Sequence, residues 1–113
     1  MATAEECRTA FDSLLARLSE LDEQTRREIP HRTLSCQVTD LNVTFITQIG
    51  PDGAEPLVEA PPDAPRAQVR FSAKSGEVMS ISAKPQSFAR LWLLRKVKVE
   101  ASLGDIAILR KFL

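Results

Sequence analysis

The sequence predicts a mixed α/β (α+β) fold in which a layer of helices covers one face of a sheet. Apolar residues at helical spacing mark the first part of the chain, and a second stripe of this kind marks its end. Between them, apolar residues alternate with polar ones along several short segments, which is the pattern of half-buried strands. The expected order is helix, strands, short helices, strand and helix, and we expect the uncovered face of the sheet to be wet.

The first helix has a marked start and an apolar stripe. Thr3 and Glu6 have the spacing of a capping box, in which each side chain bonds the backbone N–H of the other residue. The stripe consists of Cys7, Ala10, Phe11, Leu14, Leu15, Leu18 and Leu21. Residues 22–29 either prolong this helix or begin a further turn, and Pro30 ends it.

Alternation with a period of two then predicts an antiparallel hairpin. The first strand carries Leu34, Cys36 and Val38, and a polar corner follows at Thr39 and Asp40. The second strand has one apolar parity, formed by Leu41, Val43, Phe45 and Ile49 together with Thr47.

Turn residues separate this hairpin from the next strands. Residues 50–53, Gly-Pro-Asp-Gly, are a strong turn signal. Leu57 and Val58 suit a short edge strand, because Pro56 cannot donate to a central ladder. Residues 61–65 form an expected surface loop, and alternation at Val69, Phe71 and Ala73 predicts a fourth strand.

The latter half combines short helices with one more strand. Ser75 is expected to cap a helix that contains Val78, Met79 and Ser82, although residues 77–81 could also form a strand. Pro85 separates this segment from a helix with Phe88, Leu91 and Trp92 on one side. The last two predicted elements are a strand with Val97, Val99 and Ala101, and a helix capped by Ser102 and Asp105 with Leu103, Ile106, Leu109, Phe112 and Leu113 as its stripe.

Charge and sorting signals limit the classes of function. Lys and Arg number 15, as do Asp and Glu, and this balance argues against a nucleic-acid partner. No apolar stretch approaches the roughly 20 residues that span a bilayer, so we expect no stable membrane insertion. Neither a secretory signal nor a peroxisomal ending is recognisable. The expectation is a cytoplasmic protein with a single domain over residues 1–113.

The residues that carry chemistry are too few and too scattered for an active site. His31 is the one histidine and follows Pro30 at an element boundary, where an exposed, solvated ring is expected. Cys7 and Cys36 are expected to be free and buried, and with His31 they do not have metal-ligand spacing. We therefore expect no catalytic residue, no metal and no cofactor, and predict that the protein is not an enzyme.

Several segments together resemble the sterol carrier protein type 2 (SCP2) family, in its small bacterial branch. The residues that carry this resemblance are 38–45 (Val-Thr-Asp-Leu-Asn-Val-Thr-Phe), 67–72 (Ala-Gln-Val-Arg-Phe-Ser), 77–81, 87–89, 96–102 (Lys-Val-Lys-Val-Glu-Ala-Ser), 103–106 and 109–113. The resemblance implies a curved five-stranded mixed sheet with helices on one side and an apolar tunnel between them. It also implies binding of a fatty acid, acyl-CoA or sterol-like ligand without conversion.

The apolar side chains of the latter half supply the expected lining of this tunnel. The candidate ligand-binding residues are Phe45, Phe71, Val78, Met79, Phe88, Leu91, Trp92, Ile106, Leu109 and Phe112. Candidates for contacting a lipid head group are Arg70, Lys84, Arg90 and Arg95. Arg95 departs from the family, which commonly has a glycine directly before the strand at residues 96–101, and this side chain could narrow the tunnel.

A second interpretation remains open beside lipid carriage. The same fold could serve as a protein-interaction or dimerisation module without a lipid, in which case the apolar residues would fill a solid core and a homodimer could form. The two interpretations differ in whether an unfilled apolar cavity remains between the sheet and the helices.

Overall fold

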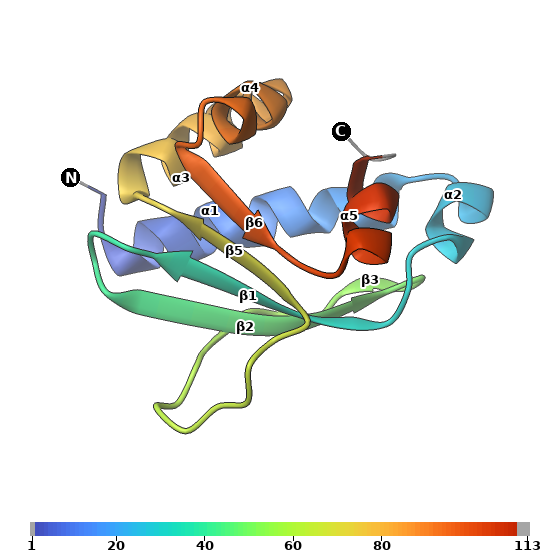
Figure 1. The fold of residues 1–113 in the computed structure, drawn as a ribbon, viewed down its shortest axis with the longest axis horizontal. Helices are drawn as coiled ribbons and strands as arrows, with labels where there is room; N and C mark the ends of the chain where they lie inside the picture. Colours follow the sequence, from blue (N-terminus) through green and yellow to red (C-terminus); the bar gives the residue numbers. More distant parts are fainter. Residues whose placement is uncertain (1, 111–113) are drawn as a thin grey trace.

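The computed structural model describes residues 2–110, and their helices lie over one face of a mixed sheet (Figure 1). The chain begins with α1 (Ala4–Ala16), a 3₁₀ turn (Arg17–Glu20), α2 (Glu23–Arg27), β1 (Arg32–Val38), β2 (Val43–Gly50), β3 (Gly53–Ala54) and β4 (Val58–Glu59). It continues with β5 (Val69–Ala73), α3 (Ser75–Ala83), a 3₁₀ turn (Pro85–Ser87), α4 (Phe88–Leu93), β6 (Val97–Glu100) and α5 (Leu103–Arg110). None of the helices described is both long and apolar enough to cross a bilayer.

The strand order of the sheet is β3-β2-β1-β5-β6, with β4 also paired to β2. Strands β1 and β5 are parallel, whereas the other pairs are antiparallel, so the sheet is mixed as expected. It has six strands, not the five that the resemblance implied. The additional one is the two-residue β3, where the backbone leaves the expected turn by way of Gly53 at a φ of 102°, a conformation that suits glycine.

The first helix and the hairpin agree with the sequence prediction, except that α1 ends before Leu18 and Leu21 and that Leu41 lies in the turn before β2. Thr3 and Glu6 form the reciprocal capping box, and Cys7, Ala10 and Phe11 face the core. Within residues 22–29, Glu23–Arg27 form a helix separate from α1, because the Asp22 side chain caps a new turn at Thr25. Along β1, Leu34, Cys36 and Val38 are buried while the residues between them are not, which places the core between this face and α1.

Ser75 does not cap α3 as the sequence predicted. The cap residue is Lys74, and Ser75 is the first residue of the helix. The Ser75 N–H and hydroxyl instead donate to the Asp40 carboxylate, at 2.8 and 2.7 Å. These bonds hold the pKa of Asp40 below its ordinary range. The acceptor for this helix terminus thus comes from the corner between β1 and β2, far away in sequence.

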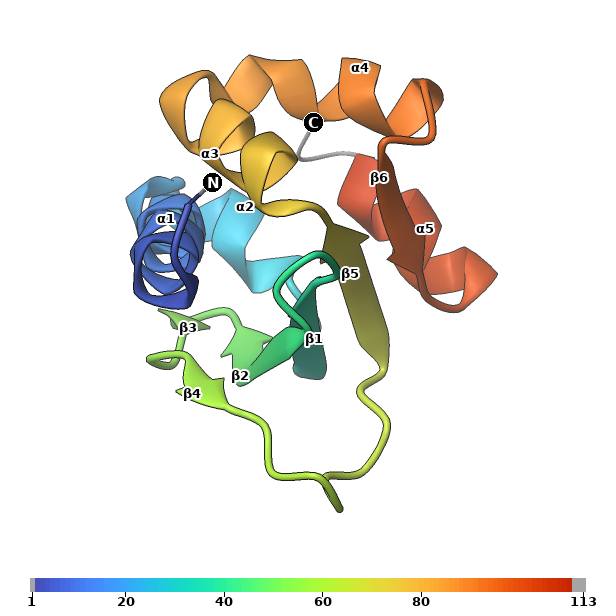
Figure 2. The same ribbon diagram turned by 90° about the vertical axis from the view of Figure 1, so that its left-hand side faces the viewer.

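The view turned by 90° shows three helices and the long loop on opposite sides of the sheet (Figure 2). Helices α1, α3 and α4 lie together on the side of the sheet opposite to the loop between β4 and β5. Helix α1 also contacts α3 directly. In the sheet order β6 is the terminal strand, and α4, which precedes it in the chain, lies beside it.

Candidate functional site

A groove of about 630 Å³ lies between α4 and the edge strand β6. This volume is within the roughly 300–1,000 Å³ typical of small-molecule sites. The groove is lined by Ala89, Trp92, Leu93, Arg95, Val97, Lys98 and Val99. Its lining is mostly apolar, and both of its charged side chains are cations.

The junction between α4 and β6 fixes the shape of this groove. The Arg95 N–H donates to the Trp92 carbonyl at 3.0 Å, and the Lys96 N–H donates to the Leu91 carbonyl at 3.0 Å. These two bonds form a Schellman motif, in which the residue after the helix takes a left-handed conformation. That residue is Arg95, at a φ of 60°. The position where the family commonly has glycine therefore has a backbone that favours glycine, and the arginine there lines the groove.

A row of aromatic rings runs from the groove into the core. Phe11 and Phe71 meet edge to face with their ring centres 5.6 Å apart, and Phe71 stacks on Phe88 at 5.7 Å. Phe88 in turn contacts Trp92 at 5.8 Å. Along this line the space between sheet and helices is occupied by the protein's own side chains, and the groove lies at the Trp92 end.

The expected tunnel residues fall into four groups. Phe45 and Val78 are core residues. Phe71, Met79, Phe88 and Leu91 are half-buried and contact the core, and Ile106 is half-buried on α5. Of the eight candidates whose side chains the structure describes, Trp92 is the one that lines the groove. The Leu109 side chain and Phe112 lie outside the described residues.

The head-group candidates are also dispersed. Arg95 lines the groove, whereas Arg70 lies 3.7 Å from the Glu100 carboxylate and donates to the Ala67 carbonyl at 2.8 Å. Lys84 and Arg90 are exposed on the turn after α3 and on α4. Lys98 was not among the candidates, because its alternation with valines marked it only as an outward-facing strand residue.

A second hollow, of about 270 Å³, lies between α1 and α3. Met79 and Ser82 face the helix α1 residues Glu5 and Glu6 across it. The Glu6 carboxylate is already engaged by the Thr3 N–H in the capping box, at 3.0 Å. This hollow is smaller and acidic on one side, and it is a poorer site for a lipid than the groove beside Trp92.

The residues with chemical reactivity are not gathered at the groove. Cys7 and Cys36 are buried and unpaired, and burial raises the pKa of Cys36 to about 12, so that its thiol stays protonated. His31 is exposed, and its ring lies against Gly50. Over residues 2–110, no three His, Cys, Asp or Glu side chains come together as metal ligands would.

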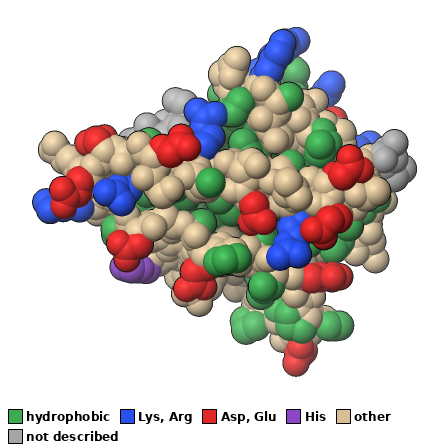
Figure 3. Space-filling view, turned by 180° about the vertical axis from the view of Figure 1, so that it is seen from behind, with side chains coloured by type: hydrophobic (Ala, Val, Ile, Leu, Met, Phe, Trp, Pro, Cys, Tyr) green, Lys and Arg blue, Asp and Glu red, His purple; other side chains and the backbone are tan. Residues whose placement is uncertain are grey.

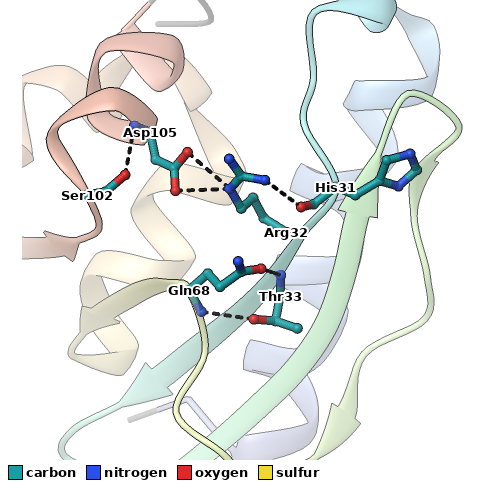
Figure 4. Close-up of polar contacts among 6 residues, drawn as sticks. All are labelled: His31, Arg32, Thr33, Gln68, Ser102 and Asp105. Atoms are coloured by element: carbon teal, nitrogen blue, oxygen red, sulfur yellow. Dashed lines mark hydrogen bonds and ion pairs between the residues drawn. The ribbon is translucent and has the colours of Figure 1, made fainter.

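Polar contacts connect α5 and the start of β5 to the start of β1 (Figure 4). The Arg32 Nε–H lies 3.1 Å from both oxygens of the buried Asp105 carboxylate. The expected cap of α5 is present, since the Asp105 N–H donates to the Ser102 hydroxyl at 3.2 Å. Thr33 and Gln68 exchange two hydrogen bonds beside this pair. The His31 carbonyl accepts from the Arg32 guanidinium at 2.8 Å while its ring points away from these contacts, and the cluster joins α5 to the start of β1.

Comparison with solved structures assigns this arrangement to a known fold. A "UbiJ-SCP2 Ubiquinone synthesis protein" superposes with a TM-score of 0.61 at 13% identity, over 96% of this chain and 89% of that one. The solution structure of palmitated SCP2L2 from Aedes aegypti superposes with a TM-score of 0.62 at 14% identity, over 92% of this chain and 90% of that one. The chain has an SCP2-like fold. Neither a family model nor a curated protein sequence matches it.

A similar fold also forms part of a larger enzyme among the solved structures. A double mutant of the sec-alkyl sulfatase PisA1 superposes with a TM-score of 0.62 at 18% identity, over 94% of this chain but only 15% of the sulfatase. An SCP2-like unit can therefore be a small portion of a longer chain. The fold alone does not decide what this protein binds.

Proposed function

We propose that this protein binds an amphipathic lipid in the groove between α4 and β6, and does not convert it. The observation that carries the proposal is the lining, in which Trp92, Leu93 and Val99 offer apolar surface beside the cations Arg95 and Lys98. Such a concave, apolar surface with a few polar groups suits a small lipophilic ligand. The SCP2-like fold supports the assignment, because the palmitated SCP2L2 shares it.

The charge of the groove favours an anionic head group. The guanidinium of Arg95 can pair with a carboxylate or phosphate in two parallel hydrogen bonds. The Lys98 ammonium lies 3.4 Å from the Glu100 carboxylate, so its charge is already partly balanced and Arg95 is the main cation of the groove. A fatty acid has a carboxylate and acyl-CoA has phosphates, whereas a sterol has only a hydroxyl. We therefore expect a fatty acid or acyl-CoA to bind more tightly than a sterol.

Binding without conversion follows from the same lining. Its side chains are alanine, tryptophan, leucine, valine, arginine and lysine, and none of these supplies a nucleophile or general base that is active near neutral pH. The ligand would be held and released unchanged.

Native mass spectrometry of the purified chain with added palmitate, palmitoyl-CoA or cholesterol tests this proposal. We expect one palmitate or acyl-CoA per chain, and loss of that adduct in Ala89→Trp, which fills the groove from α4. The matched control is Ala16→Trp, at an exposed position on α1. A wild-type spectrum unchanged by all three lipids, or an adduct that survives Ala89→Trp, would contradict the proposal.

The competing function is a dimerisation module. The position of β6 at the end of the sheet order favours it, because an unpaired strand edge can pair with a second copy. The same spectra distinguish the two, since dimerisation predicts a concentration-dependent doubled mass that does not respond to lipid.

A further inference from the structure

One segment of this electrically balanced chain is strongly basic. Residues 78–99 contain Lys84, Arg90, Arg95, Lys96 and Lys98 but no Asp or Glu, so their net charge is +5 and the rest of the chain carries −5. All five cations are exposed. In the space-filling view, the uppermost part of the molecule carries Lys, Arg and hydrophobic side chains, and most acidic side chains lie lower (Figure 3).

Two neighbouring leucines are exposed in the same segment. Leu93 is 85% exposed and Leu94 is 54% exposed, at the end of α4. Single exposed leucines are ordinary on a protein surface, but an adjacent pair on a protruding helix end is a small apolar patch. Trp92, the next residue toward the N-terminus, is half-buried in the groove.

The chain geometry keeps these leucines and cations together. The Schellman motif turns the backbone directly after Leu94, so Arg95 and Lys96 follow the leucines at the same tip. Arg95 holds its left-handed backbone there although glycine would fit with less strain. Strain of this kind is often retained at functional positions.

We propose that the α4 tip, residues 90–96, docks reversibly on the surface of an anionic lipid bilayer. Leu93 and Leu94 enter the boundary between head groups and acyl chains, while Arg90, Arg95 and Lys96 contact lipid phosphates. Leucine and tryptophan beside basic residues are typical of segments that lie in this interface. Cations near an anionic leaflet are attracted to it within a Debye length.

The size and charge of the tip favour a bilayer over a protein partner. A stable protein interface buries about 800 Å² on each partner, which two leucines and three cations do not provide. A bilayer needs no shape complementarity, and it offers many phosphates to the cations at once. The groove opens beside the same tip, so a docked protein could exchange a lipid with the bilayer. That exchange rests on the proposed function, whereas the docking does not.

Flotation with extruded vesicles tests the docking. We expect the full chain to float with phosphatidylcholine vesicles that contain 30% phosphatidylglycerol, to float much less with pure phosphatidylcholine, and to lose binding in 0.5 M NaCl. The double variant Leu93→Ser/Leu94→Ser should weaken binding at least about tenfold. Arg90→Gln/Lys96→Gln, which leaves the groove lining intact, should weaken it by about fivefold for each cation removed.

Two matched controls separate the tip from the rest of the surface. Leu103→Ser removes an 87% exposed leucine from α5, and Arg17→Gln/Lys74→Gln removes two exposed cations outside the basic segment. Both should float like the wild type. The proposal is overturned if the wild type does not float with anionic vesicles, or if the controls lose as much binding as the tip variants. It is also overturned if the tip variants abolish self-association and leave flotation unchanged, which would indicate a protein interface.

Discussion

Arg95 has a left-handed backbone conformation that is unfavourable for a residue with a side chain. A φ of 60° brings the Cβ of an ordinary residue too close to its neighbouring carbonyl, a strain that glycine does not have. The Schellman bonds of Arg95 and Lys96 hold this conformation in place, so the strain belongs to the folded state. Stability does not explain an arginine here, and the proposed head-group contact in the groove would give this side chain a role.

We expect Arg95→Gly to raise the free energy of unfolding by about 0.5–1 kcal/mol, because glycine adopts the left-handed conformation without this cost. Thermal and urea unfolding measure the change. The matched control is Arg90→Gly, which removes the same charge from the interior of α4 and should lower stability by about 1 kcal/mol. Equal destabilisation by both variants would mean that Arg95 is not strained.

Helix α5 is fixed to the sheet by a single well-buried ion pair among the contacts described. The side chain of Asp105 is 10% exposed and that of Arg32 is 32% exposed. Removal of one partner leaves the other without its counter-charge in a partly buried place. The attachment of this helix to the start of β1 therefore depends on these two residues.

Asp105→Asn should lower the free energy of unfolding by about 1–3 kcal/mol, because the Arg32 guanidinium loses its charged acceptor. Hydrogen exchange followed by mass spectrometry should show that the variant exchanges faster than the wild type in α5. The exchange rates in β1 and α1 should change less. Asp63→Asn, in the exposed loop between β4 and β5, should change neither quantity. Unchanged protection of α5 in Asp105→Asn would contradict this role.

The elements that depend on near neighbours in sequence could be predicted, and those that depend on distant contacts could not. The capping box of α1, the Ser102 cap of α5, the stripe of α1 and the alternation of β1 and β2 each involve residues a few positions apart. The Asp40 cap of α3 joins residues 35 positions apart, so nothing near Ser75 indicates it. Strand β3 is only two residues long, too short to show a period.

The groove could be predicted only in part for the same reason. Trp92 and Arg95 were candidates because one is a large apolar residue and the other replaces a glycine. Val97, Lys98 and Val99 line the groove because β6 is the last strand of the sheet, a fact of topology that the alternation of valines does not reveal. Phe45 and Val78 were candidates for the same reason as Trp92, since each is an apolar residue at a predicted inward-facing position, but they are core residues.

On the scale of the whole molecule, the groove of the described residues lies at the β6 edge of the sheet. The ring row from Phe11 to Trp92 occupies the line from the core outward, and the open groove begins where this row ends. Under the proposed function, a lipid would enter from the β6 edge without opening the core. Trp92, the single tryptophan of the chain, is at the point of entry.

The most direct test of this account is quenching of Trp92 fluorescence by a fatty acid brominated along its chain, below its micelle concentration. A bromine atom quenches tryptophan only at short range, so the signal reports occupancy of the groove itself. We predict saturable quenching with one site per chain, reversed by excess unbrominated palmitate. Fluorescence that falls only in linear proportion to added ligand, or does not change, would contradict a lipid site between α4 and β6.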